Sequence, residues 1–220
     1  MARKTGMIHA VGDNAPFFGQ IAAELMPDVE VVHFVDGGLP CMAGDELRPR
    51  VIERLRTLSG FAEESGAEAI LLTCTAFGRL VGDVEGAVTC PVLSVLEIIV
   101  DEALRLPGTI GVLGSHPGTL AAASRMLREQ ASLEGKKLEI TTRFCPGAFD
   151  AVQRDDWETH NRIVLANLRE LVEQVDVVVA PQPSVERALM EFTQAGPLVP
   201  ILTSPRLSVL RLKEALALTP

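Results

Sequence analysis

One cysteine stands where reactive chemistry is easiest to place in this chain. Cys74 ends the apolar run Ala-Ile-Leu-Leu-Thr (69–73) and precedes Thr-Ala-Phe-Gly (75–78), which could open a helix. A thiol at a helix N-terminus gains thiolate character, because the peptide dipoles and N–H groups there favour negative charge. Such a group can carry a proton or attack a ligand. The alternative is a small apolar residue buried at the end of a strand.

The other three cysteines have less to offer. Cys41, Cys90 and Cys145 lie in apolar surroundings beside Pro or Met, and we expect them to be structural. The sequence has no C-x-x-C pair and no histidine at metal-ligand spacing from a cysteine, so we expect no metal site.

Polar residues follow several other apolar runs. Asp13 could orient or charge-couple to the thiol, or could simply be a turn carboxylate in Gly-Asp-Asn (12–14). The run Gly-Val-Leu-Gly-Ser-His-Pro-Gly-Thr (111–119) has N–H groups and the hydroxyls of Ser115 and Thr119, which could bind a carboxylate. An ordinary strand–turn–helix junction capped by Thr119 fits it equally, and His116 could be a solvated loop residue. The run matches neither phosphate-binding glycine motif.

Two further residues have a structural interpretation beside the functional one. Ser184 could donate a hydroxyl hydrogen bond to a substrate, but capping of the following helix is favoured. His160 lies among acidic residues in the first turns of an expected helix, and we expect it to be exposed. The chain has no G-x-S-x-G elbow, which disfavours a serine hydrolase.

The elements that must position these residues alternate between strands and helices. Expected strands cover 7–11, 29–35, 67–73 and 92–93, and then 109–113, 137–144, 175–180 and 199–202, with helical patterns between them. This alternation predicts the α/β class, with doubly wound parallel sheets of the flavodoxin-like kind. Ligands of such sheets bind beyond the carboxyl ends of the strands.

The second half of the chain repeats the order of the first. Residues 68–74 overlay residues 176–182, so Cys74 and Gln182 hold equivalent places. We therefore expect two pseudo-symmetric domains, 1–107 and 108–220, with the last helix (204–218) packing back on the first domain.

Charge and hydropathy exclude several classes of protein. Twenty basic residues against 29 acidic ones give a net charge of −9, which argues against binding to nucleic acid or an anionic membrane surface. No apolar run reaches the length of a membrane span, and we read no signal peptide. We expect a cytoplasmic protein with reduced thiols.

Four segments together resemble the aspartate/glutamate racemase superfamily, in its branch near hydantoin racemases and arylmalonate decarboxylase. They are GAEAILLTCTAFG (66–78), IGVLGSHPGT (110–119), PGAFDAVQRDDWETHN (146–161) and VDVVVAPQPSVERAL (175–189). The resemblance covers nearly the whole chain. It implies two pseudo-symmetric α/β domains with a site between them, cofactor-independent proton chemistry next to a carboxylate, and a homodimer.

The resemblance also implies roles for single residues. Cys74 matches the first of two cysteines that flank the substrate carbon in the racemases, whereas Gln182 replaces the second. Arylmalonate decarboxylase resembles a one-cysteine version, but it keeps the opposite cysteine. Asp13 would tune the thiol. The residues expected to bind the substrate are Asn14, Thr75, Ser115, His116, Thr119, Gln182 and Ser184.

An amide at Gln182 can form hydrogen bonds but cannot exchange a proton at a useful rate, whereas racemisation needs an acid and a base on opposite faces. Two-base racemisation would therefore need a second proton carrier, for which His116 or His160 is the candidate. From the resemblance we expect an isomerase of small carboxylates that uses Cys74. The open alternatives are a one-cysteine decarboxylase and a catalytically silent protein that binds small acids.

Overall fold

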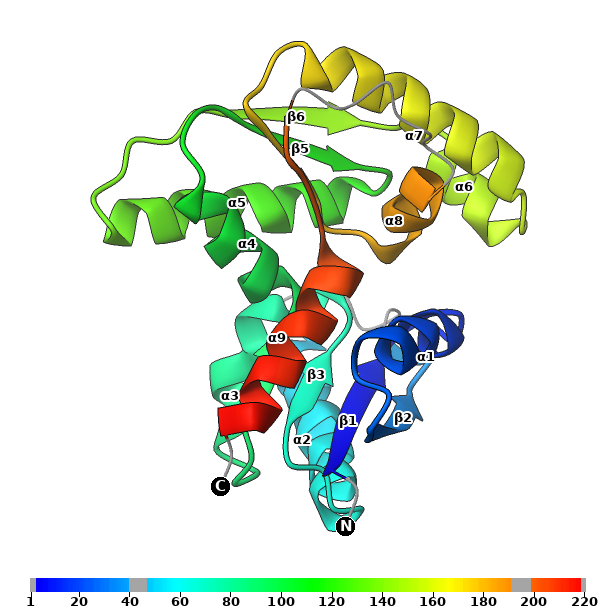
Figure 1. The fold of residues 1–220 in the computed structure, drawn as a ribbon, viewed down its shortest axis with the longest axis vertical. Helices are drawn as coiled ribbons and strands as arrows, with labels where there is room; N and C mark the ends of the chain where they lie inside the picture. Colours follow the sequence, from blue (N-terminus) through cyan, green and yellow to red (C-terminus); the bar gives the residue numbers. More distant parts are fainter. Residues whose placement is uncertain (1–2, 40–46, 191–198, 219–220) are drawn as a thin grey trace. The chain divides into compact units, whose positions relative to one another are not determined.

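The chain folds into two compact units. The computed structural model describes residues 3–39, 47–190 and 199–218. One unit contains the chain up to Val95 and the residues from Pro205 onward, and the other contains Leu96–Ser204 (Figure 1). The division therefore falls earlier than the expected boundary at 107/108, because the helix before that boundary groups with the second unit.

The first unit is built on a four-stranded parallel sheet of order β2-β1-β3-β4. Its strands are β1 (Arg3–His9), β2 (Val29–Val35), β3 (Ile70–Leu72) and β4 (Val92–Ser94). Its helices are α1 (Asn14–Leu25), α2 (Arg48–Glu64), the 3₁₀ helix η3 (Thr75–Leu80), α3 (Val81–Glu85) and, from Pro205 on, α9 (Ser204–Leu218).

The second unit repeats this plan with a four-stranded parallel sheet of order β6-β5-β7-β8. Its strands are β5 (Ile110–Gly114), β6 (Ile140–Phe144), β7 (Val177–Ala180) and β8 (Ile201–Thr203). Its helices are α4 (Val95–Arg105), α5 (Pro117–Leu133), α6 (Ala148–Gln153), α7 (Trp157–Val172) and α8 (Pro183–Met190). The predicted α/β class with two pseudo-symmetric parallel sheets is confirmed.

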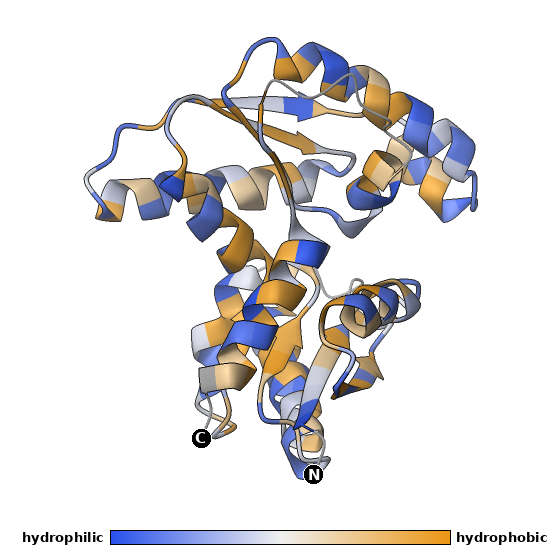
Figure 2. Cartoon of the chain, in the orientation of Figure 1, coloured by the Kyte–Doolittle hydropathy of each residue, from blue (hydrophilic) through white to orange (hydrophobic). Residues whose placement is uncertain are grey.

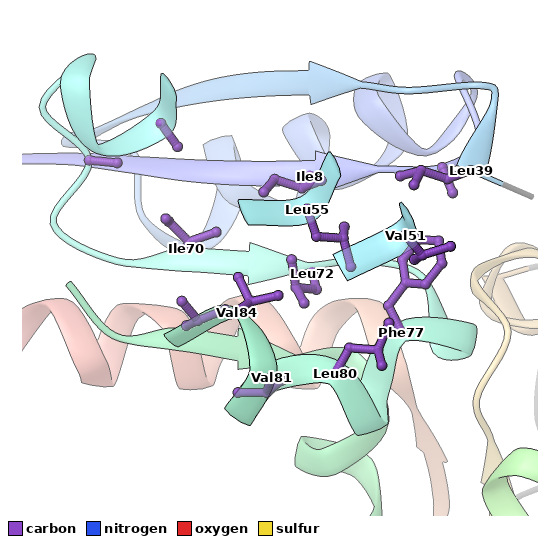
Figure 3. Packing of buried hydrophobic residues seen from close by; sticks show 14 residues of the cluster. Ile8, Leu39, Val51, Leu55, Ile70, Leu72, Phe77, Leu80, Val81 and Val84 are labelled. Atoms are coloured by element: carbon purple, nitrogen blue, oxygen red, sulfur yellow. The ribbon is translucent and has the colours of Figure 1, made fainter. Parts of the chain in front are cut away.

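The short central strands are apolar because both of their faces are covered. Ile70, Leu71 and Leu72 are all fully buried, and β3 is hydrophobic along its length, whereas the helices mix both kinds of residue (Figure 2). In the first unit, Ile8 and Leu72 from the sheet pack with side chains of α2, η3 and α3 (Figure 3). A matching cluster that includes Leu113, Val178 and Ala180 forms the core of the second unit.

Candidate active site

The predicted site residues follow the carboxyl ends of strands in both units. Asp13, Asn14, Cys74 and Thr75 follow strands of the first sheet, and Ser115, His116, Thr119, Gln182 and Ser184 follow strands of the second. We call these sets the first edge and the second edge. Each is described by itself.

Cys74 on the first edge lies between a buried strand and an anchored helix. Its backbone is extended, and its carbonyl oxygen accepts a 3.0 Å hydrogen bond from the Phe77 N–H. Phe77 and Leu80 of η3 insert into the apolar cluster of the unit (Figure 3). The thiol itself is half-buried, with part of the side chain packed on this cluster. The surrounding core thus holds the cysteine at a defined point without enclosing it.

The electrostatic environment of Cys74 is the reverse of the one expected. Burial raises the pKa of the Cys74 thiol, and a hydrogen bond from the Ala76 N–H offsets only part of this effect. The segment after the cysteine is a 3₁₀ helix of six residues rather than a long α-helix, so it supplies little dipole. Cys74 is therefore protonated at neutral pH, and its resting state is that of a proton donor.

Three residues beside Cys74 form a polar chain, in which Thr73 and His9 are buried and His33 is half-buried. The Thr73 hydroxyl lies 2.8 Å from Nδ1 of His9, and Nε2 of His9 lies 2.9 Å from Nδ1 of His33. Burial, together with the neighbouring His33, lowers the pKa of His9 to about 3, and burial also lowers the pKa of His33. Sequence reasoning missed this chain. Its only signal was one histidine in each of two neighbouring strands. His33 pairs with Met7, and His9, two residues further along β1, shares a face with Met7.

Asp13 and Asn14 lie at the start of α1. Asp13 is exposed and its carboxylate caps no N–H group of the helix. Asn14, the first helical residue, is half-buried, and its N–H donates to the Val11 carbonyl oxygen at 3.2 Å. Thr75, directly after the cysteine, is 5% exposed. Of these residues, Thr75 is therefore the most enclosed, whereas the Asp13 carboxylate is exposed and does not cap α1.

Gln182 occupies the second edge at the place equivalent to Cys74. Its Oε1 accepts a 2.6 Å hydrogen bond from the Ser115 N–H, and its Nε2 donates to the Ser115 hydroxyl at 3.2 Å. Both side chains are buried. A Cβ on Gly114 would lie 2.9 Å from the same Oε1, so this glycine leaves the space that the carboxamide fills. Gln182 is thus fixed in place as a hydrogen-bonding group.

The turn before α5 uses its own N–H groups internally. Nδ1 of His116 accepts a 3.1 Å hydrogen bond from the Gly118 N–H and caps the helix, and Gln182 takes the Ser115 N–H. The expected anion loop therefore lacks these two donors. Thr119, expected as a possible cap, is half-buried within the first turn of α5. His116 is exposed, as a solvated residue would be, but it has the role of cap.

Two other expectations on the second unit are wrong. Ser184 is the second residue of α8, so it does not stand at the capping position before the helix. His160, expected to be exposed, is fully buried. Its Nδ1 bonds to Asn161 at 2.9 Å, its ring packs edge-on against Trp157, and burial lowers its pKa. Its Nε2 has no hydrogen-bond partner among the described residues.

The remaining cysteines differ from Cys74 in their surroundings. Cys145 is fully buried, and burial raises its pKa to about 12. Cys90 is half-buried, and burial and the charge of Glu63 raise its pKa. Cys41 lies outside the described residues.

The described ranges hold neither a metal site nor a membrane span. They contain no cluster of three or more histidine, cysteine or acidic residues arranged to hold a metal ion. Across the same ranges, none of the helices has the length and apolar character to cross a membrane.

Two parallel-sheet units of the same strand order, each with its polar residues after the strand ends, define the class as a duplicated α/β protein. Residues 23–180 match the family model described as Asp/Glu/Hydantoin racemase. The chain belongs to this Asp/Glu/Hydantoin racemase family. A comparison with curated proteins finds no match.

Solved structures share the fold at low sequence identity. An aspartate racemase from Picrophilus torridus superposes with a TM-score of 0.74 at 13% identity, covering 98% of this chain and 94% of that one. An aspartate racemase homologue from Pyrococcus horikoshii gives 0.72 at 16% identity, over 99% and 100% of the two chains. A glutamate racemase from Francisella tularensis, crystallised with D-glutamate, gives 0.71 at 14% identity, over 98% and 81%.

Proposed function

We propose that the protein is a cofactor-independent isomerase of a small carboxylate, such as an amino acid, and that Cys74 transfers a proton at the carbon next to the carboxylate. The observation that carries the proposal is a half-buried thiol after a central strand, in a chain of the Asp/Glu/Hydantoin racemase family. Inversion at this carbon takes two proton transfers, one on each face. Cys74 makes one of them: as a thiolate it removes the proton, or as a thiol it delivers one to the planar intermediate. The exposed His116 is the proposed carrier on the other face, because the Gln182 amide exchanges no proton at a useful rate. The reaction proposed here needs no cofactor.

The other edge residues have proposed supporting roles. Asp13 tunes the thiol through its exposed, uncapped carboxylate. The substrate carboxylate is held by hydroxyl, amide and ring N–H groups, because none of the proposed binding residues is a lysine or an arginine. The proposed binding residues are Asn14, Thr75, Ser115, His116, Thr119, Gln182 and Ser184. His116 would contribute Nε2–H, since its Nδ1 is occupied by Gly118.

The fixed carboxamide of Gln182 supports a second candidate reaction. A group that cannot exchange a proton leaves only one face of the intermediate with an acid. Decarboxylation of a 2-substituted malonate suits this arrangement: the C–C bond to the departing CO₂ breaks, and the remaining carbanion takes the proton of Cys74. The Gln182 amide could then stabilise an enediolate oxygen.

A panel of small acids in D₂O tests these proposals. Aspartate, glutamate, other amino acids, 2-substituted malonates and maleate are incubated with the protein, and deuterium at Cα, optical inversion and CO₂ release are measured. We expect one class to react, and Cys74→Ser to lower that rate by orders of magnitude with an unchanged circular dichroism spectrum. CO₂ release separates the decarboxylase from the isomerase.

Cys90→Ser is the matched control, because Cys90 is another half-buried thiol of the same unit. It should leave the rate unchanged. Unchanged turnover in Cys74→Ser contradicts the proposal, and binding without exchange or conversion indicates a silent protein that binds small acids.

A further inference from the structure

The residue before Cys74 is joined to the end of the neighbouring strand by side-chain as well as backbone bonds. The Thr73 N–H donates to the Ile8 carbonyl oxygen at 3.0 Å, which continues the pairing of β3 with β1 by one residue. The Thr73 hydroxyl lies 3.0 Å from the same oxygen and 2.8 Å from Nδ1 of His9. Thr73 and His9 are both fully buried.

One arrangement of protons satisfies all the side-chain bonds together. The Ile8 oxygen can only accept, so the Thr73 hydroxyl donates to it and must accept from Nδ1–H of His9. Nε2 of His9 then accepts from Nδ1–H of His33. Protonation of His33 would add a hydrogen at its Nε2 and would leave this arrangement intact.

The chain lies between the first sheet and α1. The ring of His9 packs on Phe18, and a Cβ on Gly19 would lie 3.2 Å from Nε2 of His33, so the missing side chain of this glycine lets the imidazole approach the helix. The contacts of these two histidines with Phe18 and Gly19 tie the second turn of α1 to the strand end that precedes Cys74.

The second edge lacks this device. When the pairing of β5 with β7 is continued by two residues beyond Val112 and Val179, Pro181 stands opposite Gly114, as Thr73 stands opposite His9 on the first edge. Proline has no N–H and no hydroxyl, and glycine has no side chain, so neither bond of the first edge can form there. The second edge, where Gln182 stands in the place of Cys74, therefore has no threonine–histidine pair either.

We propose that Thr73 and His9 are positioning residues that set the reactivity of Cys74. The proposal rests on the proposed function, because it assigns these residues to the same thiol. Thr73 acts through the backbone it shares with Cys74: holding it to β1 keeps Sγ where the Ala76 N–H can bond to it. Without that restraint the bond weakens and the thiol ionises at higher pH.

The pH profile of alkylation tests the proposal without knowledge of the substrate. Iodoacetamide labelling of Cys74 is followed by mass spectrometry in the full-length protein. The midpoint of the profile reports the ionisation of the thiol, whereas the plateau at high pH reports access to it. We expect Thr73→Val to raise the midpoint by about half a pH unit or more, a threefold or greater slowing on the rising limb. Thr73→Ser should restore it.

Thr5→Val is the matched control. The Thr5 hydroxyl donates to the Ala69 carbonyl oxygen at 2.8 Å, so it is another fully buried threonine that joins β1 to the chain of β3. Its loss should cost similar stability and leave the Cys74 midpoint in place. Cys90, in the same unit, gives an internal reference for the labelling.

A second pair of variants decides the matter if Thr73→Val does not fold. His9→Asn keeps a donor near the position of Nδ1 and should behave as wild type, whereas His9→Leu should raise the midpoint. The proposal is overturned if the deciding variant leaves the midpoint unchanged, or if Thr5→Val moves it equally. Failure of the proposed function is a different result: it would show as unchanged turnover in Cys74→Ser.

Discussion

The two sheet edges have the same topology and opposite contents. On the first edge, His9 and Thr73 hold the strand end together and Cys74 follows with a half-buried thiol. On the second edge, Gly114 and Pro181 take their places, and the carboxamide of Gln182 fills the space above the glycine. The two units share a strand order. At the equivalent place after the third strand, the first unit has the titratable thiol of Cys74 and the second has the fixed amide of Gln182.

The largest expected effect separates the two edges by truncation. Cys74→Ala should abolish detectable exchange, a loss of a thousandfold or more, because it removes the proposed proton carrier. Gln182→Ala should cost about a hundredfold, the lower end of the range for loss of one hydrogen-bond donor to a developing charge. Rates of deuterium exchange measured side by side check the asymmetry, and equal losses at the two positions would contradict it.

Acid should destabilise the first unit through its buried histidine. The pKa of His9 is lowered from 6.5 to about 3, so the unfolded chain binds a proton more readily than the folded one between these values. The contribution of His9 to stability is therefore complete above pH 6.5 and falls as the pH drops toward 3, by about 5 kcal/mol in all. Burial of His33 and His160 acts in the same direction.

Urea unfolding between pH 7 and pH 4 measures this dependence. His9→Leu should flatten it, whereas a slope that is equally steep in the variant would assign the effect to other groups. Replacement of His160 by Leu gives the corresponding measurement on the second unit.

A methyl group added at Gly114 should lower stability moderately. In Gly114→Ala, the new Cβ would lie 2.9 Å from Oε1 of Gln182 and 3.1 Å from Cδ2 of Leu120, so the carboxamide must move off the Ser115 N–H. A buried N–H left without its partner costs about 1–3 kcal/mol. Gly60→Ala, at an uncrowded position inside α2, should instead be neutral or slightly stabilising. Thermal unfolding of both variants checks the difference.

The smallest effect on stability is expected at two exposed acids, one in each unit, that lie near helix starts. Asp13 and Asp150 are both exposed, near the starts of α1 and α6. Replacement of either by Asn should leave Tm within about 2 °C. Only Asp13→Asn should lower the exchange rate, by about tenfold or more. Equal rates in the two variants would remove Asp13 from the proposed mechanism.

Local patterns in the sequence predict the strands and helices but not the hydrogen bonds and burial of the residues at the two edges. Strand–helix alternation predicts the parallel sheets, and the overlay of 68–74 on 176–182 places Cys74 and Gln182 equivalently, because both signals are local. The pKa direction of Cys74 was missed because it depends on burial and on a six-residue 3₁₀ helix. The pairing of Ser115 with Gln182 joins residues far apart in the chain, which periodicity cannot show.

The burial of His160 illustrates the same limit. Its neighbours in sequence are acidic and polar, which indicates an exposed turn, yet it is fully buried at the start of α7 beside Trp157. Trp157 in turn lies under the guanidinium of Arg187 from α8. The packing of one helix against another therefore decides the exposure of this histidine, and no local pattern encodes it.

The close packing of Gln182 on Gly114 constrains how this chain could acquire a cysteine at position 182. A cysteine at 182 is shorter than glutamine, so by itself it would leave a void next to β5 and leave the Ser115 N–H without its hydrogen-bond partner. A route to that cysteine therefore runs through both positions, with a side chain at 114 compensating for the one lost at 182. Neither change alone is expected to be well tolerated, so a cysteine at position 182 is hard to acquire by one mutation.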